Sequence, residues 1–263
     1  MPAPQRAKPA LSEAKGCPRY EPLMPNAVEL EVIACSLEDA LAAEEGGASR
    51  VELTVRLDQD GLTPPLELTR AVTSRVRIPV RAMLRDRPDF DVGSVDDLAR
   101  LQQQAADLAS VGVEGLVTGF VSGDALDFEA LDAILSAVPG VRFTIHRAIE
   151  RTRDPAVTLR QLRRFSNVDR ALVSGGPSSI EDWKARLADY REAFGAGRKL
   201  IVGGGLTFDM LPALRKDPGL TVFHLGRSVR TPESAEGKVD AAKVRAACDR
   251  LIDARSGARP SEP

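Results

Sequence analysis

Two short apolar runs in this sequence end in a histidine. The first is followed by His146 and Arg147 in the stretch FTIHRAIE, and the second contains His224 in TVFHLG. The whole chain has only 2 histidines. Buried ionisable side chains are costly unless they are paired, so these two endings predict that both imidazoles contribute to one polar site. Because histidine titrates near neutral pH, proton transfer is the chemistry that this pattern favours.

Short apolar runs alternate regularly with amphipathic stretches along the chain, and this alternation predicts strands and helices in turn. The strands are expected at residues 28–34, 50–54, 79–84, 114–118, 141–146, 169–173, 199–202 and 220–225. Eight strand-then-helix units in about 225 residues are typical of one α/β fold, the TIM (β/α)8 barrel, whose parallel strands close into a cylinder. A doubly wound open sheet is the alternative, but no G-x-G-x-x-G follows the first strand.

The barrel is expected to form a single domain over residues 27–255. Residues 1–26 are rich in proline, alanine and charge without an apolar period, so we expect a flexible N-terminal extension. Residues 256–263, SGARPSEP, are expected to form a flexible C-terminal tail. Ser36 and Ser94 stand where helix N-caps are expected, and Gly46 and Gly112 stand where helices should end.

The composition excludes several classes of protein. The 263 residues are 43% hydrophobic, which is enough for a large core. A net charge of −2 and a pI near 5.9 argue against a nucleic-acid partner. No apolar stretch reaches the roughly 18–20 residues that cross a bilayer, so no membrane partner is expected. The N-terminus lacks the apolar segment of a secretory signal, and the 3 cysteines show no C-x-x-C spacing, which predicts a cytoplasmic location.

Alternate residues of a barrel strand point into the barrel and toward the helices. In the first three expected strands, this alternation directs charged side chains inward. The inward set contains three carboxylates and three guanidinium groups: Glu29, Glu31, Glu52, Arg50, Arg81 and Arg85. Because the opposite signs balance, Glu29, Glu31, Arg50 and Arg81 could form a buried ion-pair layer that only fixes the strands, or they could belong to a functional site. Arg85 stands at the end of its strand, where a site is expected, and Glu52 is placed to support it.

The carboxyl ends of the strands form the rim at which TIM barrels build their sites. We expect His146 to act there as general acid/base, oriented by Glu52 or Glu31. Arg85 or Arg147 would hold the anionic group of a substrate. The substrate-binding residues expected around them are Arg50, Arg85, Arg147, Thr118, Ser174 and His224.

Three consecutive glycines, Gly203, Gly204 and Gly205, follow the seventh expected strand. Glycine turns expose backbone N–H groups, and the loops after strands seven and eight are the usual phosphate-binding corner of this fold. Thr207 is placed to cap the next helix, and Arg227, after the eighth strand, would add a charge-assisted contact. The sequence therefore predicts a phosphate-binding loop here and a second, weaker anion site at VSGGPSSI, after the sixth strand.

Several segments together resemble the CutC family, which is named for copper homeostasis. They are LEVIACSLEDALAAEEGGASRVELT, GLTPPLELTRAV, IPVRAMLR, FTIHRAIE, LVSGG, IVGGGL and FHLGRS, and they run from about Leu30 to Ser228. The resemblance implies a TIM barrel, a cytoplasmic location and assembly as a homodimer. It also implies copper tolerance and Cu(I) binding by cysteines on the first two strands, at positions that hold Ile33 and Thr54 in this chain.

Three functions are open at this point. The first is an enzyme or sensor of a small anionic or phosphorylated metabolite, with lyase or isomerase chemistry through His146. The second, implied by the resemblance, is Cu(I) trafficking, in which Cys35 would bind the metal together with Met83 or a histidine; these are the soft ligands that Cu(I) prefers. The third is a scaffold for interactions without a working site. Copper is the one cofactor considered, since no zinc or iron motif is present.

Overall fold

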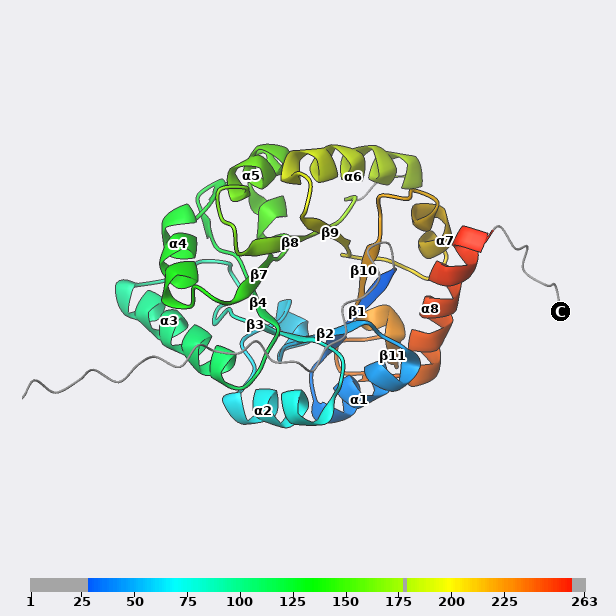
Figure 1. The fold of residues 1–263 in the computed structure, drawn as a ribbon, viewed down its shortest axis with the longest axis horizontal. Helices are drawn as coiled ribbons and strands as arrows, with labels where there is room; N and C mark the ends of the chain where they lie inside the picture. Colours follow the sequence, from blue (N-terminus) through cyan, green and yellow to red (C-terminus); the bar gives the residue numbers. More distant parts are fainter. Residues whose placement is uncertain (1–27, 177–178, 257–263) are drawn as a thin grey trace, which may run out of the picture.

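The computed structural model describes residues 28–176 and 179–256, which form one closed barrel of parallel strands surrounded by helices (Figure 1). The strands of the barrel are β1 (Glu29–Ala34), β2 (Arg50–Leu53), β3 (Val80–Met83), β4 (Gly115–Thr118), β7 (Arg142–Ile145), β8 (Val168–Val173), β9 (Lys199–Val202) and β10 (Val222–Leu225). They pair in the order β1-β10-β9-β8-β7-β4-β3-β2. Each predicted strand coincides with one of them, so the predicted TIM barrel is confirmed.

The helices form an outer ring around the strands. They are α1 (Leu37–Gly46), α2 (Leu66–Arg75), α3 (Val95–Ser110), α4 (Phe128–Ala137), α5 (Pro155–Leu162), α6 (Ile180–Phe194), α7 (Met210–Arg215) and α8 (Ala241–Ser256). The expected N-terminal extension lies outside the described residues, as do residues 257–263 of the expected tail. The boundary predicted at residue 256 was one residue early, because α8 includes Ser256. None of the helices described is long and apolar enough to cross a membrane.

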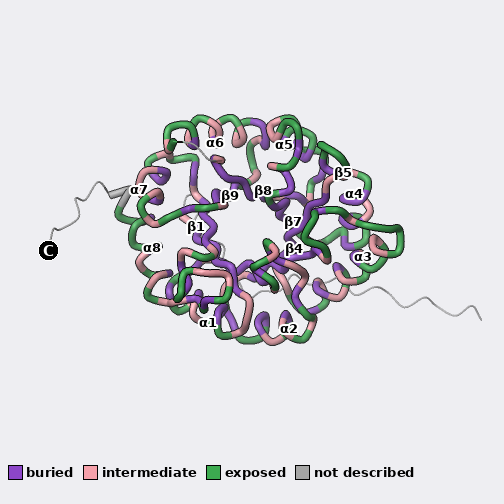
Figure 2. The backbone as a smooth tube through the Cα atoms, turned by 180° about the vertical axis from the view of Figure 1, so that it is seen from behind, coloured by how far each residue is buried: buried purple, intermediate pink, exposed green. Residues whose placement is uncertain are grey.

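The main hydrophobic core lies between the strands and the helices. In α3, for example, Leu101, Ala105 and Leu108 are buried, which is the spacing that places side chains on one face of a helix. Figure 2 shows the consequence for the whole fold: the barrel strands are buried along most of their length, while the outer turns of the helices are exposed. Inside the barrel, a separate apolar cluster contains only Leu172, Ile201 and Val222.

The helix-start signals in the sequence are mostly matched by the structure. The Ser36 side chain accepts a hydrogen bond from Asp39 N and begins α1, and Ser94 and Asp97 form a capping box at α3. The expectation for Thr207 was wrong, because α7 begins at Met210 and has no side-chain cap. Only six residues long, this helix also starts too late to direct its N-terminus at the glycine turn.

Charged side chains fill the interior at the amino-terminal ends of the strands. Arg81 is fully buried and donates to both Glu114 oxygens, at 2.6 and 3.1 Å, and to both Asp169 oxygens, at 2.8 Å each. It also donates to Thr144 Oγ1 at 2.7 Å. The sequence predicted that Arg81 points inward, but its two carboxylate partners were not foreseen; one directly precedes β4 and the other lies in β8.

A second group of charges completes this layer around Glu29. The carboxylate of Glu29 lies 3.0 Å from Arg50 Nη1 and 2.9 Å from Arg170 Nη1, and it accepts a hydrogen bond from Lys199. We call the whole layer the base network; its members are Glu29, Arg50, Arg81, Glu114, Asp169, Arg170 and Lys199. Each of its carboxylates contacts at least one cation, so this part of the interior is an ion-pair layer that joins the strands.

Short elements after the strands build the rim. They are η1 (Leu57–Gln59), η2 (Arg147–Arg151), η3 (Arg227–Val229), the hairpin of β5 (Val121–Ser122) with β6 (Ala125–Leu126), and the hairpin of β11 (Arg230–Thr231) with β12 (Lys238–Val239). Buried Arg230 donates to Ile33 O and to Asp39 Oδ2, both at 3.0 Å. This contact fastens the last hairpin to the start of the chain's first helix.

Candidate active site at the barrel mouth

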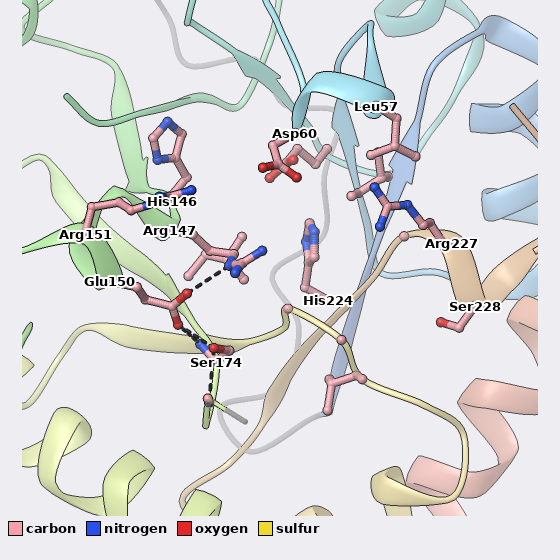
Figure 3. Close-up of a pocket in the computed structure, with 18 of the residues that line it drawn as sticks. Leu57, Asp60, His146, Arg147, Glu150, Arg151, Ser174, His224, Arg227 and Ser228 are labelled. Carbon is pink, nitrogen blue, oxygen red and sulfur yellow. Dashed lines mark hydrogen bonds and ion pairs between the residues drawn. The ribbon is translucent and has the colours of Figure 1, made fainter. Parts of the chain in front are cut away.

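A cavity of about 770 Å³ opens at the carboxyl ends of the barrel strands. Both histidines, His146 and His224, line it, as expected of residues at the carboxyl ends of strands in one closed barrel (Figure 3). The acidic side chains of its wall are Glu52, Asp60, Glu150 and Glu233, and the basic ones are Arg85, Arg147, Arg151, Arg186 and Arg227. The two histidines that end apolar runs in the sequence therefore line the same polar cavity.

His146 is held in one tautomer by the backbone. It precedes η2, and its Nδ1 accepts a hydrogen bond from Ala148 N at 3.1 Å, so the ring proton is on Nε2. Nε2 is buried and has no partner among the described residues. Burial and the charge of Arg85 lower the pKa of His146 to about 3. The imidazole is therefore neutral and presents an N–H donor; its role as general acid/base stays a prediction.

Glu31 and His224 form a buried ion pair across the neighbouring strands β1 and β10. The two residues are register partners, and Glu31 Oε1 lies 2.9 Å from His224 Nδ1. Burial alone would raise the pKa of Glu31, but the hydrogen bond and charge of His224 keep it below its usual value. Burial alone would lower the pKa of His224, but Glu52 and Glu31 raise it. Glu31 thus orients His224, whereas we expected it to orient His146.

Glu52 is the least satisfied charged group at the mouth. Its side chain is buried, at 3% relative exposure, and forms no hydrogen bond or ion pair with the described residues. Burial raises the pKa of Glu52 to about 7; the charge of Glu31 acts in the same direction, and His224 and Arg85 oppose it. A carboxyl group of this kind can both accept and release a proton near neutral pH.

Arg85 is fixed above this floor by contacts that do not involve carboxylates. It donates to Gly61 O at 3.0 Å and to Gln59 O at 2.5 Å, and its guanidinium lies 4.3 Å from the centre of the Phe90 ring. The ring of Phe90 also meets His146 edge-on at 5.1 Å. One buried nitrogen of Arg85, Nη1, has no partner among the described residues, so a ligand anion could use it.

The other arginines lie closer to solvent. Arg147 donates to Glu150 at 2.9 Å, and Glu150 in turn accepts from the backbone N and the Oγ of Ser174, at 2.5 and 2.6 Å (Figure 3). Exposed Arg227 forms no hydrogen bond or ion pair with any residue that the structure describes. Arg147 and Ser174 are therefore tied to each other through Glu150, while Arg227 is free to bind a ligand.

The glycine turn after β9 is required by close approach and by backbone conformation. A Cβ on Gly204 would lie 2.9 Å from Ser174 Cβ, and Gly204 and Gly205 have φ values of 74° and 91°. Gly203 donates its N–H to Val173 O, so it is part of the sheet and is not available to an anion. The N–H groups of Gly204 and Gly205 make no hydrogen bond to the described residues, and both glycines line the cavity.

Several predicted site residues lie elsewhere. Arg50 belongs to the base network, where Glu29 and Glu114 contact it, and it does not line the cavity. Thr118 donates to Leu84 O and is buried between strands. In the second glycine segment, Gly176 lines the cavity, but residues 177 and 178 lie outside the described residues.

The comparisons with known proteins agree with this fold. A model described as the CutC family matches residues 28–229. The chain is 33% identical to a CutC family protein of Xanthomonas campestris pv. campestris over 211 residues, which cover 79% of this chain and 85% of that protein. A CutC family protein of Mesorhizobium japonicum is 31% identical over 207 residues, with coverage of 78% and 80%. This chain belongs to the CutC family.

Solved structures extend the likeness in fold. The CutC protein of Streptococcus agalactiae superposes with a TM-score of 0.66 at 23% identity, covering 76% of this chain and 98% of that one. A phosphoribosylanthranilate isomerase of Thermotoga maritima superposes with a TM-score of 0.58 at 15% identity, covering 86% of this chain and 99% of that one. At these identities the likeness shows a shared barrel and carries no activity with it.

The residues of this CutC chain do not fit a thiolate site for Cu(I). Met83 lines the cavity, but Cys35 does not, and Ile33 faces the cavity where the resemblance implied a cysteine. The Cys35 thiol lies 3.5 Å from Arg230 Nη2, and burial raises its pKa. Cu(I) prefers thiolate, thioether and imidazole ligands, and Cys35 lies outside the cavity that Met83 and the two histidines line.

Sequence reasoning also missed wall residues of the CutC cavity. Glu150 and Arg151 follow His146 within FTIHRAIER, and the tight turn of η2 brings them back to the rim. Asp60 comes from the loop after β2 and has a φ of 60°, which places it at the mouth. The first two could have been found from their short distance in sequence to His146, but no pattern marked Asp60.

Proposed function

We propose that this CutC family protein binds a small anionic or phosphorylated metabolite at the barrel mouth and transfers a proton next to its carbonyl group, as an isomerase or lyase does. One observation carries the proposal: the buried Glu52 carboxyl, without a partner among the described residues, lies in a cavity whose rim carries arginine side chains. Natural folds rarely leave a buried carboxyl unsatisfied, and perturbed groups of this kind gather at functional sites.

The anionic group would bind at the turn after β9. Gly204 and Gly205 offer backbone N–H groups that are not used within the described residues, and Arg227 adds a positive charge from the loop after β10. Two free N–H donors and a guanidinium form the kind of site that phosphate and carboxylate groups occupy. The support comes from these backbone groups and not from α7, which begins further along the chain.

The reaction would use the two buried groups of the floor in different ways. Glu52 would accept a proton from carbon and return it, since it lines the cavity and its buried Oε2 has no partner among the described residues. His146 would donate its Nε2–H to the substrate oxygen on which negative charge develops, as a fixed neutral donor. A neutral histidine beside a carboxylate base is a known arrangement for proton transfer between carbon atoms.

Phosphate binding tests the anion site. Isothermal titration with inorganic phosphate should give one binding event, and Arg227→Ala should weaken it about tenfold or more, because a charge-assisted hydrogen bond is lost. Arg77→Ala is the matched control, since Arg77 is exposed and outside the cavity. Equal phosphate affinity of Arg227→Ala and the unchanged protein would contradict the anion site.

Proton transfer can be tested without knowing the substrate. The protein is incubated in D2O with a mixture of anionic carbonyl metabolites, and deuterium incorporation is followed by mass spectrometry. We expect incorporation into at least one metabolite with the unchanged protein and none with Glu52→Gln. Incorporation at equal rates with both proteins would remove Glu52 from the mechanism.

Two further expectations belong to this proposal, a cytoplasmic location and assembly as a homodimer. They are supported by the cysteine pattern and by the family resemblance. Sedimentation velocity of the purified chain tests the homodimer, and a monomer at all concentrations would contradict it.

A further inference from the structure

Three ligand-type side chains meet on adjacent strands at the floor of the cavity. His224 on β10 and Glu31 on β1 are register partners, and Glu52 lies on β2, next to β1 on its other side. One ligand atom from each residue lies within 4.8 Å of the other two. All three side chains are buried, yet Glu52 and His224 also line the cavity, so the group is reached from solvent through the mouth.

The carboxylates of this group have more acceptor capacity than the described residues use. Glu31 Oε2 and Glu52 Oε2 are both buried without a partner, although Glu31 Oε1 is bonded to His224. Arg85, whose positive charge acts on Glu52, directs its hydrogen bonds to Gly61 O and Gln59 O. Burying unpaired carboxylate oxygens is costly unless something else binds them.

We propose that Glu31, Glu52 and His224 bind a divalent cation of the borderline class, with Zn²⁺ and Co²⁺ as representatives. Two carboxylate oxygens and one imidazole nitrogen are ligands that such ions accept, and three protein ligands leave a position open toward the cavity. Metal–ligand distances of about 2.0–2.2 Å require the donor atoms to approach each other, which shifts of about 1 Å in each side chain provide. The absence of sulfur from the three ligands disfavours Cu(I).

This inference goes beyond the proposed function and does not require it, because the cation can bind without any substrate. Where both hold, they compete for the same oxygen of Glu52. A bound cation would make Glu52 a ligand and so remove it as proton acceptor. The cation would then inhibit the proposed proton transfer.

The test uses the full chain, freed of metal with a chelator that is then removed. Titration with Co²⁺, followed by visible absorption, and with Zn²⁺, followed by calorimetry, should show one cation per chain. Glu52→Gln and His224→Gln should each weaken binding by about a hundredfold, since each removes a direct ligand. Glu52→Gln removes a buried charge without a partner, so this variant should fold. If His224→Gln does not fold, cation binding by Glu52→Gln still tests the site.

Asp60→Asn is the matched control, because Asp60 is a carboxylate of the same cavity outside the three ligands, and asparagine tolerates its positive φ. It should bind Co²⁺ as the unchanged protein does. Arg227→Ala should also bind normally, which separates this test from that of phosphate binding. Absence of cation binding by the unchanged protein, or equal binding by Glu52→Gln, would overturn the inference.

Discussion

The two ends of the barrel interior hold similar charged groups, but those at the base are paired with opposite charges and those at the mouth are only partly paired. In the base network, Glu29 contacts Arg50, Arg170 and Lys199, and Glu114 contacts Arg81 at 2.6 Å. Its carboxylates each have cations within hydrogen-bonding distance. At the mouth, Glu52 has no such partner among the described residues, and only one oxygen of Glu31 is bonded.

This difference separates a structural role from a functional one more clearly than residue type does. Paired charges fix the positions of strands, but they have no capacity left for a ligand. Charges that are buried and incompletely paired cost stability, and a protein keeps them where a ligand or a proton will complete them. The sequence left both interpretations open for Glu29, Glu31, Arg50 and Arg81. The structure places three of them in the paired base network and Glu31 beside His224 at the mouth.

Arg81→Leu should cause the largest change, because it breaks the base network. It removes the cation that contacts both Glu114 and Asp169, and we expect a loss of roughly 3–5 kcal/mol in the free energy of unfolding. Urea unfolding measures this loss. Arg87→Leu, at an exposed pair with Asp89, is the control and should change little. A loss at Arg81 as small as that at Arg87 would mean that the base network does not hold the barrel together.

Acid should destabilise the base network through Glu29 and Glu114. Arg170, Lys199 and Arg50 outweigh burial and lower the pKa of Glu29 to about 2, and Arg81 does the same for Glu114, from an ordinary value of 4.5. A carboxyl whose pKa is lower in the folded chain than in the unfolded chain stabilises the fold at pH values above the unfolded-chain pKa. This stabilisation, on the order of 3 kcal/mol for each group, should disappear as the pH falls from 4.5 toward 2.

Unfolding free energies measured across that pH range test this expectation. Glu114→Gln supplies the comparison, since it removes one of the two titrating carboxyls and should flatten the dependence on pH. An unchanged slope in Glu114→Gln would show that other groups cause the acid unfolding.

Glu52→Gln should show that the pH dependence of stability at the mouth has the opposite sign to that at the base. Because the pKa of Glu52 is raised to about 7, the folded state holds a proton that the unfolded state loses above its ordinary 4.5, and stability falls as the pH rises between these values. The variant lacks this loss. Measured with chelator present, it should therefore be more stable than the unchanged protein by about 1–3 kcal/mol above neutral pH and nearly equal to it in acid. Equal stability of the two proteins at all pH values would mean that folding does not raise the pKa of Glu52.

Much of the barrel could be predicted from the sequence. Its strands are short apolar runs separated by helices whose starts carry capping serines, and these local signals agree with one another along the chain. The inward direction of Glu31, Glu52 and Arg81 followed from the alternation of side chains in a strand. Such patterns depend only on neighbours in sequence, so no knowledge of contacts was needed.

The pairing of these inward residues could not be predicted, because it depends on how the strands are staggered. Glu31 meets His224 since the first and last strands of the barrel close in that register. Between β7 and β8 the register shifts at Phe143 and Thr144, a change that no sequence pattern indicated. The tautomer of His146 is set by a backbone N–H two residues on, which again requires coordinates.

His146→Asn should produce the smallest change in stability, and it separates the two roles of this histidine. The side chain accepts a hydrogen bond from Ala148 N at the start of η2, and asparagine can take over this contact, as it does at helix N-caps. We expect a loss below about 1 kcal/mol for His146→Asn and a larger one for His146→Ala, which loses the contact. Both variants lack the Nε2–H donor, so both should abolish the deuterium incorporation expected of the unchanged protein. If His146→Asn keeps that activity, the imidazole only closes the turn, and the chemistry of the mouth must depend on Glu52 and the rim arginines alone.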